Sequence, residues 1–329
     1  MQVYYIGGDP ALTDHSGTVT TDSACFDPNY SRCAIAVGTG MFVNIPVEPA
    51  VDLSTPDSSG GLWLHVMWQL ERTYEHQHDL AQNIFCALDS SGNLVAESAG
   101  YRYSPAIRLY APSGSVVSPN RSLLFLPSAL TAYDFHFYTD DGGSRCLDLY
   151  ENGALIEALT MPGEPLTDIA SFRLGTSSES TTAGLGCFSE LVVADFDTRH
   201  MRVATYVPTA DGTYLDGTGD YTAVAEADPD GALLTLDTAP ASHSVVLSPV
   251  GTFDLPGIIA AVAGGRVATS DGSSLEFGLR STDGQESFSG PLAVGTVIAP
   301  HTHTWMRHNN PAWTGPMDLN GAELIVRAS

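Results

Sequence analysis

The sequence predicts an all-β protein made of two sandwich-like domains. Short apolar runs recur roughly every 8 to 12 residues, with glycine, asparagine or aspartate turns between them, as in antiparallel sandwiches. No segment shows a convincing amphipathic helix. The stretch from Phe188 to Pro208 has an apolar run, a polar turn at 195–200 and a second apolar run. This order is typical of the last strand of one domain leading into the first strand of the next.

The first domain is predicted to span residues 31–198, after an N-terminal arm or irregular lead-in at 1–30. That lead-in is polar, and we expect it to be held only if something packs on Val3–Ile6. In the run LWLHVMWQL, the even-numbered residues from Leu62 to Leu70 are all apolar and form the expected core face. His65, on the opposite face, is expected to be half-exposed. The strands predicted for this domain are 32–47, 62–70, 84–88, 94–96, 106–110, 122–126, 133–138, 145–150, 154–161, 172–174 and 188–193.

The second domain, residues 199–329, is predicted to be a smaller β-sandwich. Its near-continuous apolar run at 255–263 is interpreted as a fully buried central strand. Residues 311–321 could form a short helical turn before the last strand. The strands predicted here are 201–207, 221–225, 233–236, 244–247, 257–263, 266–268, 275–281, 293–298 and 323–327.

Charge is the sharpest feature of the composition. The 329 residues carry 38 acidic and 13 basic side chains, for a net charge of −25, and every basic residue is Arg. Such a surface repels phosphate backbones, so nucleic-acid binding is disfavoured. No apolar run approaches the ~20 residues of a transmembrane helix, and the N-terminus lacks the pattern of a signal peptide. We therefore expect the protein to be synthesised in a cytoplasm and not to insert into a membrane.

The five cysteines are dispersed and include no C-x-x-C pair, which argues against a zinc site or a disulfide scaffold. Cys86, Cys146 and Cys187 lie in apolar strand patterns and are expected to be buried thiols. The locally plausible bridge is Cys25–Cys33.

Two long segments resemble known families. The segment 134–160, DFHFYTDDGGSRCLDLYENGALIEALT, with FRLGTSS and CFSELVVAD after it, resembles the back half of a laminin-G or concanavalin-like jelly roll. The segment 189–226, together with the closing AWTGPMDLNGAELIVRAS, resembles tailed-phage virion proteins that join a lectin-like sandwich to a C-terminal β domain. The resemblance implies a jelly-roll fold for the first domain and a place in a phage particle. It marks architecture rather than chemistry.

Candidate ligand-binding residues are the aromatic side chains expected on loops, because the apolar face of a sugar packs on an aromatic ring. They are Tyr101, Tyr103, Tyr110 and Trp305. Weak candidates for a metal site are His301 and His303, which would share one face of a strand and could meet around a three-fold axis. The acids Asp211, Asp216, Asp220, Glu226, Asp228 and Asp230 offer calcium-type oxygens but match no EF-hand spacing. A second H-x-H, His76 and His78, lies in a polar loop.

Catalytic motifs are missing from the sequence: it has no G-x-S-x-G, Walker loop, dinucleotide fingerprint or H-E-x-x-H. Carboxylate pairs such as Glu71 with Glu75, or Asp140 with Asp141, could suggest glycoside hydrolysis, but close pairs arise by chance among 38 acids. We expect a non-enzymatic protein without a cofactor.

The sequence therefore favours a structural protein of a tailed phage, a tail fibre or tail-tip appendage that contacts the host surface and could bind a glycan there. The expected partners are other virion proteins and further copies of the chain, with a trimer favoured. Two alternatives stay open: a capsid-decorating or head-fibre protein, and a secreted carbohydrate-active enzyme.

Overall fold

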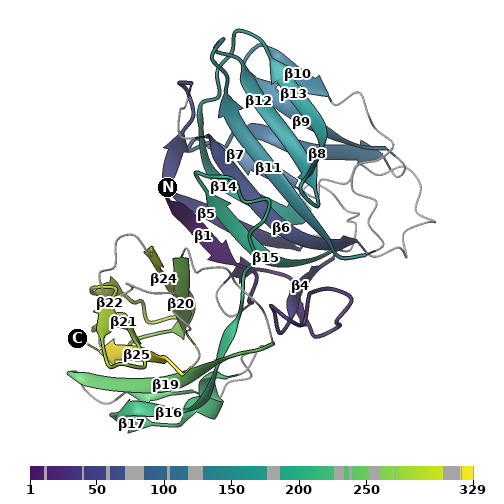
Figure 1. Cartoon of the computed structure of the whole chain (residues 1–329). Coiled ribbons are helices and arrows are strands. Elements are labelled where there is room, and N and C mark those ends of the chain that lie inside the picture. Colours follow the sequence, from purple (N-terminus) through teal and green to yellow (C-terminus); the bar gives the residue numbers. More distant parts are fainter. Residues whose placement is uncertain are drawn as a thin grey trace. The chain divides into compact units, whose positions relative to one another are not determined.

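The structure of the chain, a computed structural model, describes residues 1–10, 13–38, 41–56, 60–70, 85–101, 104–117, 129–175, 186–225, 233–236, 239–251, 260–270, 272–306, 319 and 321–328. Strands hold 60% of the described residues and helices 2%, so the predicted all-β class is confirmed. The chain forms two compact units (Figure 1). Unit 1 comprises Met1–Gly8, Thr13–Asp27 and Cys33–Val203, and unit 2 comprises Asp9–Leu12, Pro28–Arg32 and Ala204–Ser329.

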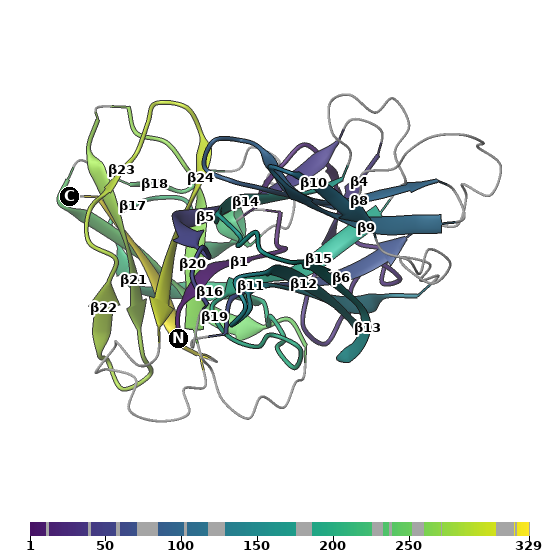
Figure 2. The same cartoon turned by 90° about the horizontal axis from the view of Figure 1, so that it is seen from above.

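Unit 1 is a sandwich of two antiparallel sheets, which Figure 2 shows as two layers. Among the described residues, sheet A has the order β13-β12-β11-β6-β15-β4-β3, with β1 also paired to β15. Sheet B has the order β10-β9-β8-β7-β14-β5-β2. The strands of sheet A are β1 (Val3–Gly7), β3 (Thr18–Thr20), β4 (Ala34–Val37), β6 (Leu62–Leu70), β11 (Thr131–Thr139), β12 (Arg145–Glu151), β13 (Ala154–Met161) and β15 (Gly186–Ala194). Those of sheet B are β2 (Asp14–His15), β5 (Phe42–Asp52), β7 (Phe85–Leu88), β8 (Leu94–Tyr101), β9 (Ser104–Ala111), β10 (Gly114–Val117) and β14 (Asp168–Gly175).

The core of unit 1 lies between the inner faces of the two sheets. Leu62, Leu64, Val66 and Trp68 belong to it, so the predicted core face of β6 is confirmed. Phe85 of sheet B stacks on Phe135 of sheet A with ring centroids 4.3 Å apart. Because successive strand residues point to opposite sides, the same alternation turns the residues between these core positions to the outer faces. Those outer faces carry the chemistry described below.

The N-terminal 30 residues contribute β1, β2 and β3 to unit 1 where an arm or irregular lead-in was expected. β1 pairs with β15 from Val3 opposite Ala194 to Gly7 opposite Leu191. The lead-in was expected to be held only if something packs on Val3–Ile6, and β15 provides that contact. Two short stretches, Asp9–Leu12 and Pro28–Arg32, belong to unit 2. There the Arg32 guanidinium pairs with Asp9 (Nε–Oδ2 2.8 Å) and donates to the Ala225 carbonyl (2.6 Å).

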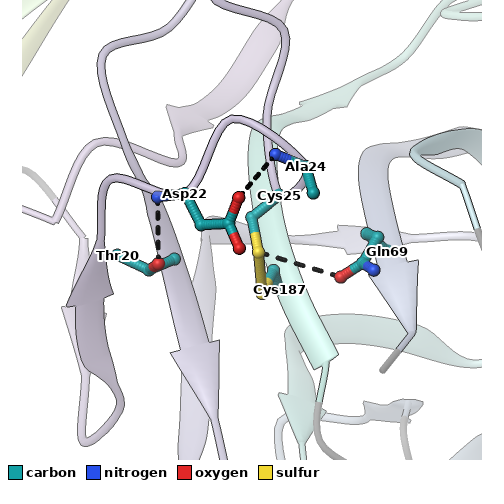
Figure 3. Close-up of a disulfide and its surroundings, with 6 residues drawn as sticks. All are labelled: Thr20, Asp22, Ala24, Cys25, Gln69 and Cys187. Carbon is teal, nitrogen blue, oxygen red and sulfur yellow. Dashed lines mark hydrogen bonds between the residues drawn. A yellow bond between two sulfur atoms is a disulfide. The ribbon is translucent and has the colours of Figure 1, made fainter. Parts of the chain in front are cut away.

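Cys25 and Cys187 form a disulfide that closes 162 residues of sequence, with Cα atoms 5.4 Å apart (Figure 3). This corrects two expectations: Cys187 is not a free thiol, and the bridge to Cys25 is not made by Cys33. The pairing follows from the sheet, because β4 lies beside β15 and the segment between β3 and β4 returns Cys25 to that strand. The Asp22 carboxylate accepts the Ala24 N–H (3.0 Å) in that segment. Cys86 and Cys146 remain free thiols, as predicted; Cys146 is buried, but Cys86 is only half-buried.

Unit 2 is built on sheet C, whose strands have the order β16-β19-β25-β21-β22 in the described part of the chain, with β23 paired to β21. Its core joins Phe277 and Leu279 of sheet C to Ala263 and Trp305 of the β20-β24 ribbon. The elements of unit 2 are β16 (Tyr206–Leu215), β17 (Gly217–Thr218), η2 (Tyr221–Val224), β18 (Thr235–Leu236), β19 (Ala241–Pro249), β20 (Ala260–Val267), β21 (Ser274–Arg280), β22 (Glu286–Phe288), β23 (Leu292–Ala293), β24 (Ala299–Met306) and β25 (Glu323–Ala328).

Several strand predictions in unit 2 were wrong. Residues 201–205 and 294–298 lie outside strands, although strands were expected at 201–207 and 293–298. The segment 221–225 contains the 3₁₀ helix η2 in place of a strand, because the Asp220 carboxylate accepts the Thr222 N–H (2.9 Å) and caps it. The run expected as a fully buried central strand contributes to β20, which is mostly half-buried and pairs with β24 alone among the described strands. Among the described residues η2 is the one helix, and no helix there is long and apolar enough to cross a bilayer.

Candidate functional site

The structure does not bring together the four aromatic residues proposed from the sequence. Tyr101 ends β8, and Tyr103 lies outside the described residues. Tyr110 is half-buried on β9 of sheet B, where its hydroxyl donates to the Glu97 carboxylate. Trp305 is 5% exposed in the core of unit 2, so it cannot stack on a ligand. Trp305 was expected on a loop, but it lies on β24 and belongs to the core with Phe277 and Leu279.

The candidate metal ligands also have other surroundings. His301 and His303 lie on β24, where the His303 ring meets Trp305 edge-to-face at 4.6 Å and burial lowers its pKa from 6.5. Asp211, Asp216 and Asp220 accept the backbone N–H groups of Tyr221, Ser242 and Thr222, so they hold turns. Nowhere in the described ranges do three or more His, Cys, Asp or Glu side chains gather as a metal site would require. Outside those ranges lie Glu71, Glu75, His76, His78, Glu226, Asp228, Asp230, His308, the predicted strand 122–126 and most of 311–321.

A different cluster emerges on the outer face of sheet A. The register of β6, β11 and β12 places Trp63 opposite His136, and His136 opposite Asp148. Directly opposed residues in an antiparallel sheet share one face and lie about 5 Å apart. We call this cluster the aromatic face; its members are Trp63, His136, Tyr138, Asp148, Tyr150 and Arg199, which follows β15.

Four rings of the aromatic face stack on one another. The centroids of Trp63 and His136 are 4.1 Å apart at an interplanar angle of 11°, and His136 continues the stack to Tyr138 at 4.5 Å. Tyr150 lies 5.5 Å from Trp63. The ring edges and their polar atoms are thereby fixed relative to one another, and Tyr138 directs its hydroxyl to the Asp148 carboxylate (3.4 Å).

Arg199 covers part of this stack. Its guanidinium carbon lies 4.7 Å from the Tyr150 centroid and 5.5 Å from that of Trp63, within the range of cation–π attraction. Asp197, two residues earlier, pairs with the guanidinium, and its hydrogen bonds to Arg199 lower the pKa of that carboxyl. Both side chains stay accessible, with 32% of Arg199 and 43% of Asp197 exposed. The face therefore offers guanidinium donors and carboxylate acceptors beside its rings.

Buried polar contacts anchor the segment that carries Arg199. The Asp134 carboxylate accepts the Thr198 hydroxyl and contacts His65 Nδ1, each at 2.8 Å, and all three side chains are buried. His65 was expected to be half-exposed, but it is 1% exposed because this segment covers it. On the far side, Arg202 makes a forked bond to the buried Glu190 carboxylate (2.7 Å from both Nε and Nη2) and also pairs with Asp27. Glu190 sits in a β15 bulge at φ 51°.

Partial burial shifts the pKa values of the titratable groups on the aromatic face. Desolvation is the main cause that lowers the pKa of His136 to about 4, so the imidazole is neutral near pH 7. His136 Nε2 contacts the Gly60 carbonyl at 2.5 Å, which fits an Nε2–H donor. Burial also raises the pKa of Asp148, although hydrogen bonds from Tyr138 and Tyr150 oppose that shift. Neutral aromatic rings beside hydrogen-bonding edges are suited to uncharged polyhydroxyl ligands.

Sequence reasoning missed the aromatic face because its residues come from positions 63 to 199 and meet only through sheet register. The sequence did contain a signal, because the outward-facing positions of β6, β11 and β12 are unusually rich in aromatic and titratable side chains for a strand face exposed to solvent. These residues are Trp63, His65, His136, Tyr138, Asp148 and Tyr150.

Comparisons with known proteins yield structural likeness alone. No family model matches the chain, and no curated protein matches it. Among solved structures, the receptor-binding domain of botulinum neurotoxin D aligns with 97% of this chain and 93% of its own, at 7% identity and a TM-score of 0.40. The cellulose-induced protein Cip1 aligns with 58% of this chain and 90% of its own, at 14% identity and a TM-score of 0.39. An endo-β-1,4-glucuronan lyase from Trichoderma reesei covers the same shares at 10% identity and a TM-score of 0.37. At these TM-scores no function follows from the likeness.

Proposed function

We propose that this protein binds glycans without cleaving them, and that the aromatic face of unit 1 is the binding surface. The observation that carries the proposal is the juxtaposition of the half-buried Tyr138 and Tyr150 rings with the Asp148 carboxylate and the Arg199 guanidinium. Trp63 is 5% exposed, so it supports the stack from beneath and is not itself a contact for a ligand. A sugar presents C–H groups to aromatic side chains and hydroxyls to carboxylates and guanidinium groups, and this surface supplies both kinds of partner.

The proposal favours binding over hydrolysis because of where the carboxylates lie. Glycoside hydrolysis needs two carboxyl groups that flank the scissile bond. Asp134, which shares the outer face with Asp148, is 0% exposed beneath Thr198 and cannot reach a ligand. Asp197 is accessible, but its ion pair with Arg199 lowers the pKa of the carboxyl and makes it a poor proton donor. Asp148 would then act as a hydrogen-bond acceptor.

We further propose that the setting of this glycan binding is a tailed-phage particle, with the chain serving as a tail fibre or tail-tip appendage on the host surface. The support is the resemblance of segment 189–226 to phage virion proteins. Copies of the chain would associate, with a trimer favoured. The edge strand β13 supports association, since its eight residues include one charge and no proline, and Leu155 is 55% exposed.

The test of glycan binding is an array of bacterial surface polysaccharides probed with the full chain, followed by calorimetry on those that bind. Tyr138→Ala should weaken binding about tenfold, or about 1.4 kcal/mol. The matched control is Tyr214→Ala, a half-buried tyrosine of unit 2 that donates to Glu286. Equal binding by both variants would overturn the assignment of the face. Cleavage of any bound glycan would favour the secreted-enzyme alternative.

Association is tested by light scattering across a salt series. Like-charged subunits at −25 repel over about 30 Å at 0.01 M salt but only about 8 Å at 0.15 M, so the oligomer should tighten as salt rises. Leu155→Glu should weaken it. A monomer at every ionic strength would move the assignment toward the capsid-decorating alternative, in which partners hold the protein.

A further inference from the structure

A row of polar residues crosses the outer face of sheet B, on the other side of the sandwich from the aromatic face. The register pairs Asp14 with Asn44, Asn44 with Arg173, Arg173 with Cys86, Cys86 with Glu97, and Glu97 with Arg108. Their strand neighbours, such as Phe172 and Ala87, lie in the core, so the row faces outward. We call these six residues the polar row. Six neighbouring strands each contribute one member.

Most of the polar row is internally paired. Asn44 Nδ2 donates to Asp14 (3.2 Å) at one end. Toward the other end the Glu97 carboxylate, which is largely buried, accepts from the Tyr110 hydroxyl and from Arg108 (3.4 Å). These contacts fix the carboxylates on both sides of the centre.

Arg173, at the centre of the row, is the exception. Within the described residues no carboxylate pairs with it, and its Nε is buried without a hydrogen-bond partner. Its guanidinium packs on the Phe42 ring, 4.9 Å from the centroid. The neighbouring Cys86 does not neutralise it, because burial raises the pKa of that thiol and keeps it protonated near pH 7. By contrast, Arg32, Arg202 and Arg280 each pair with an acid.

An unpaired, half-buried guanidinium is costly, since desolvation is not offset by a counter-charge. In a chain with 38 acids and 13 arginines, an acidic partner is the easiest one to supply. We propose that Arg173 is kept unpaired to bind the carboxylate of an acidic sugar, with Asn44 and the Glu97–Tyr110 pair contacting its hydroxyls. This site is distinct from the aromatic face and does not depend on it.

The chemistry of the row favours a carboxylate over a phosphate or sulfate. The planar guanidinium fork matches a carboxylate through two parallel hydrogen bonds. Asp14 and Glu97 stand on either side of Arg173, and the net charge of −25 repels a dianion more strongly than a monoanion. A polyhydroxyl monoanion meets each of these constraints.

The experiment titrates the full chain with D-galacturonic acid and N-acetylneuraminic acid at 0.15 M salt, followed by NMR, with D-glucose and inorganic phosphate as comparison probes. Arg173→Gln should weaken binding of the acidic sugars at least tenfold, and Arg173→Lys should give an intermediate loss because it keeps the charge but not the fork. Arg266→Gln, which removes an equally charged but exposed residue of β20 in unit 2, should leave binding unchanged.

Three results would overturn the proposal: no saturable binding of either acidic sugar, unchanged binding by Arg173→Gln, or phosphate binding as tight as that of the acidic sugars. A melting curve guards against misfolding, and Arg173→Gln should melt no lower than the wild type because the charge it removes is unpaired. The two sites are separable, since Tyr138→Ala should spare binding of acidic sugars and Arg173→Gln should spare glycan binding on the aromatic face.

Discussion

Arginines on the outer faces of unit 1 differ in whether an acid pairs with them. Beside sheet A, Arg199 pairs with Asp197, and Arg202 pairs with Glu190 and Asp27, so each guanidinium holds a segment of chain in place. On sheet B, Arg173 lies half-buried among strands of the same sandwich with no acidic partner in the described residues. A paired charge identifies a residue that maintains the fold. Arg173, which no acid pairs among the described residues, is the residue that we propose is retained for a ligand at some cost in stability.

The largest expected effect concerns the cysteines, because one is bonded to a partner on sheet A and another is unbonded on sheet B. Cys187 of sheet A is bridged to Cys25, whereas Cys86 of sheet B is a free thiol. A cross-link over 162 residues restricts the unfolded chain enough to contribute about 5 kcal/mol. Cys25→Ser should therefore lose several kcal/mol in urea unfolding without reductant, and Cys86→Ser about 1 kcal/mol or less. Equal losses would mean that the bridge does not stabilise unit 1.

The arginine contrast gives the next effect. Arg202→Gln leaves the buried Glu190 carboxylate uncompensated and should cost about 3 kcal/mol in unfolding free energy. Arg173→Gln leaves no such group and should cost nothing measurable. Urea unfolding of both variants compares them directly. A large loss for Arg173→Gln would show that Arg173 supports the fold after all and would remove the distinction between the faces.

A third effect depends on pH and belongs to sheet A, because the polar row contains no histidine. The pKa of His136 is about 4 in the folded protein against 6.5 in the unfolded chain. The unfolded chain therefore binds the proton more readily, so stability is complete above pH 6.5 and falls as the pH is lowered toward 4. The loss attributable to His136 should reach about 2–3 kcal/mol.

Asp148, Asp197 and Arg199 also act on the aromatic face, so the wild type must be compared with His136→Gln. The pH dependence that disappears in this variant is the contribution of His136. If both proteins lose the same stability between pH 6.5 and 4, the imidazole is not desolvated in the way described.

The smallest effect compares hydroxyls. Tyr110→Phe removes the donor to the largely buried Glu97 of sheet B, and should cost about 1 kcal/mol. Tyr138→Phe removes a longer bond (3.4 Å) to Asp148, whose side chain is 15% exposed against 8% for Glu97, and should cost less. Thermal unfolding of the two variants ranks them, and the reverse order would contradict the burial described for Glu97.

Local patterns were sufficient to predict the fold class. The alternation in LWLHVMWQL identified the core face of β6, whose Leu62, Leu64, Val66 and Trp68 lie in the core. Features that depend on register were out of reach, because the sequence does not state which strands are neighbours. Cys25 meets Cys187 only once β4 lies beside β15, and Trp63, His136 and Asp148 align only when β6, β11 and β12 pair in their observed register. Trp305 was misassigned because it was expected on a loop, whereas it lies on β24 and faces the core of unit 2.

The most direct test of the account is hydroxyl-radical footprinting of the full chain, with and without a host-surface polysaccharide that binds it. We expect Tyr138 and Tyr150 of the aromatic face to lose reactivity when the polysaccharide is present, while Tyr214 of unit 2 reacts equally in both samples. Unchanged reactivity of Tyr138 and Tyr150 with the polysaccharide bound would contradict the assignment of glycan binding to the outer face of sheet A.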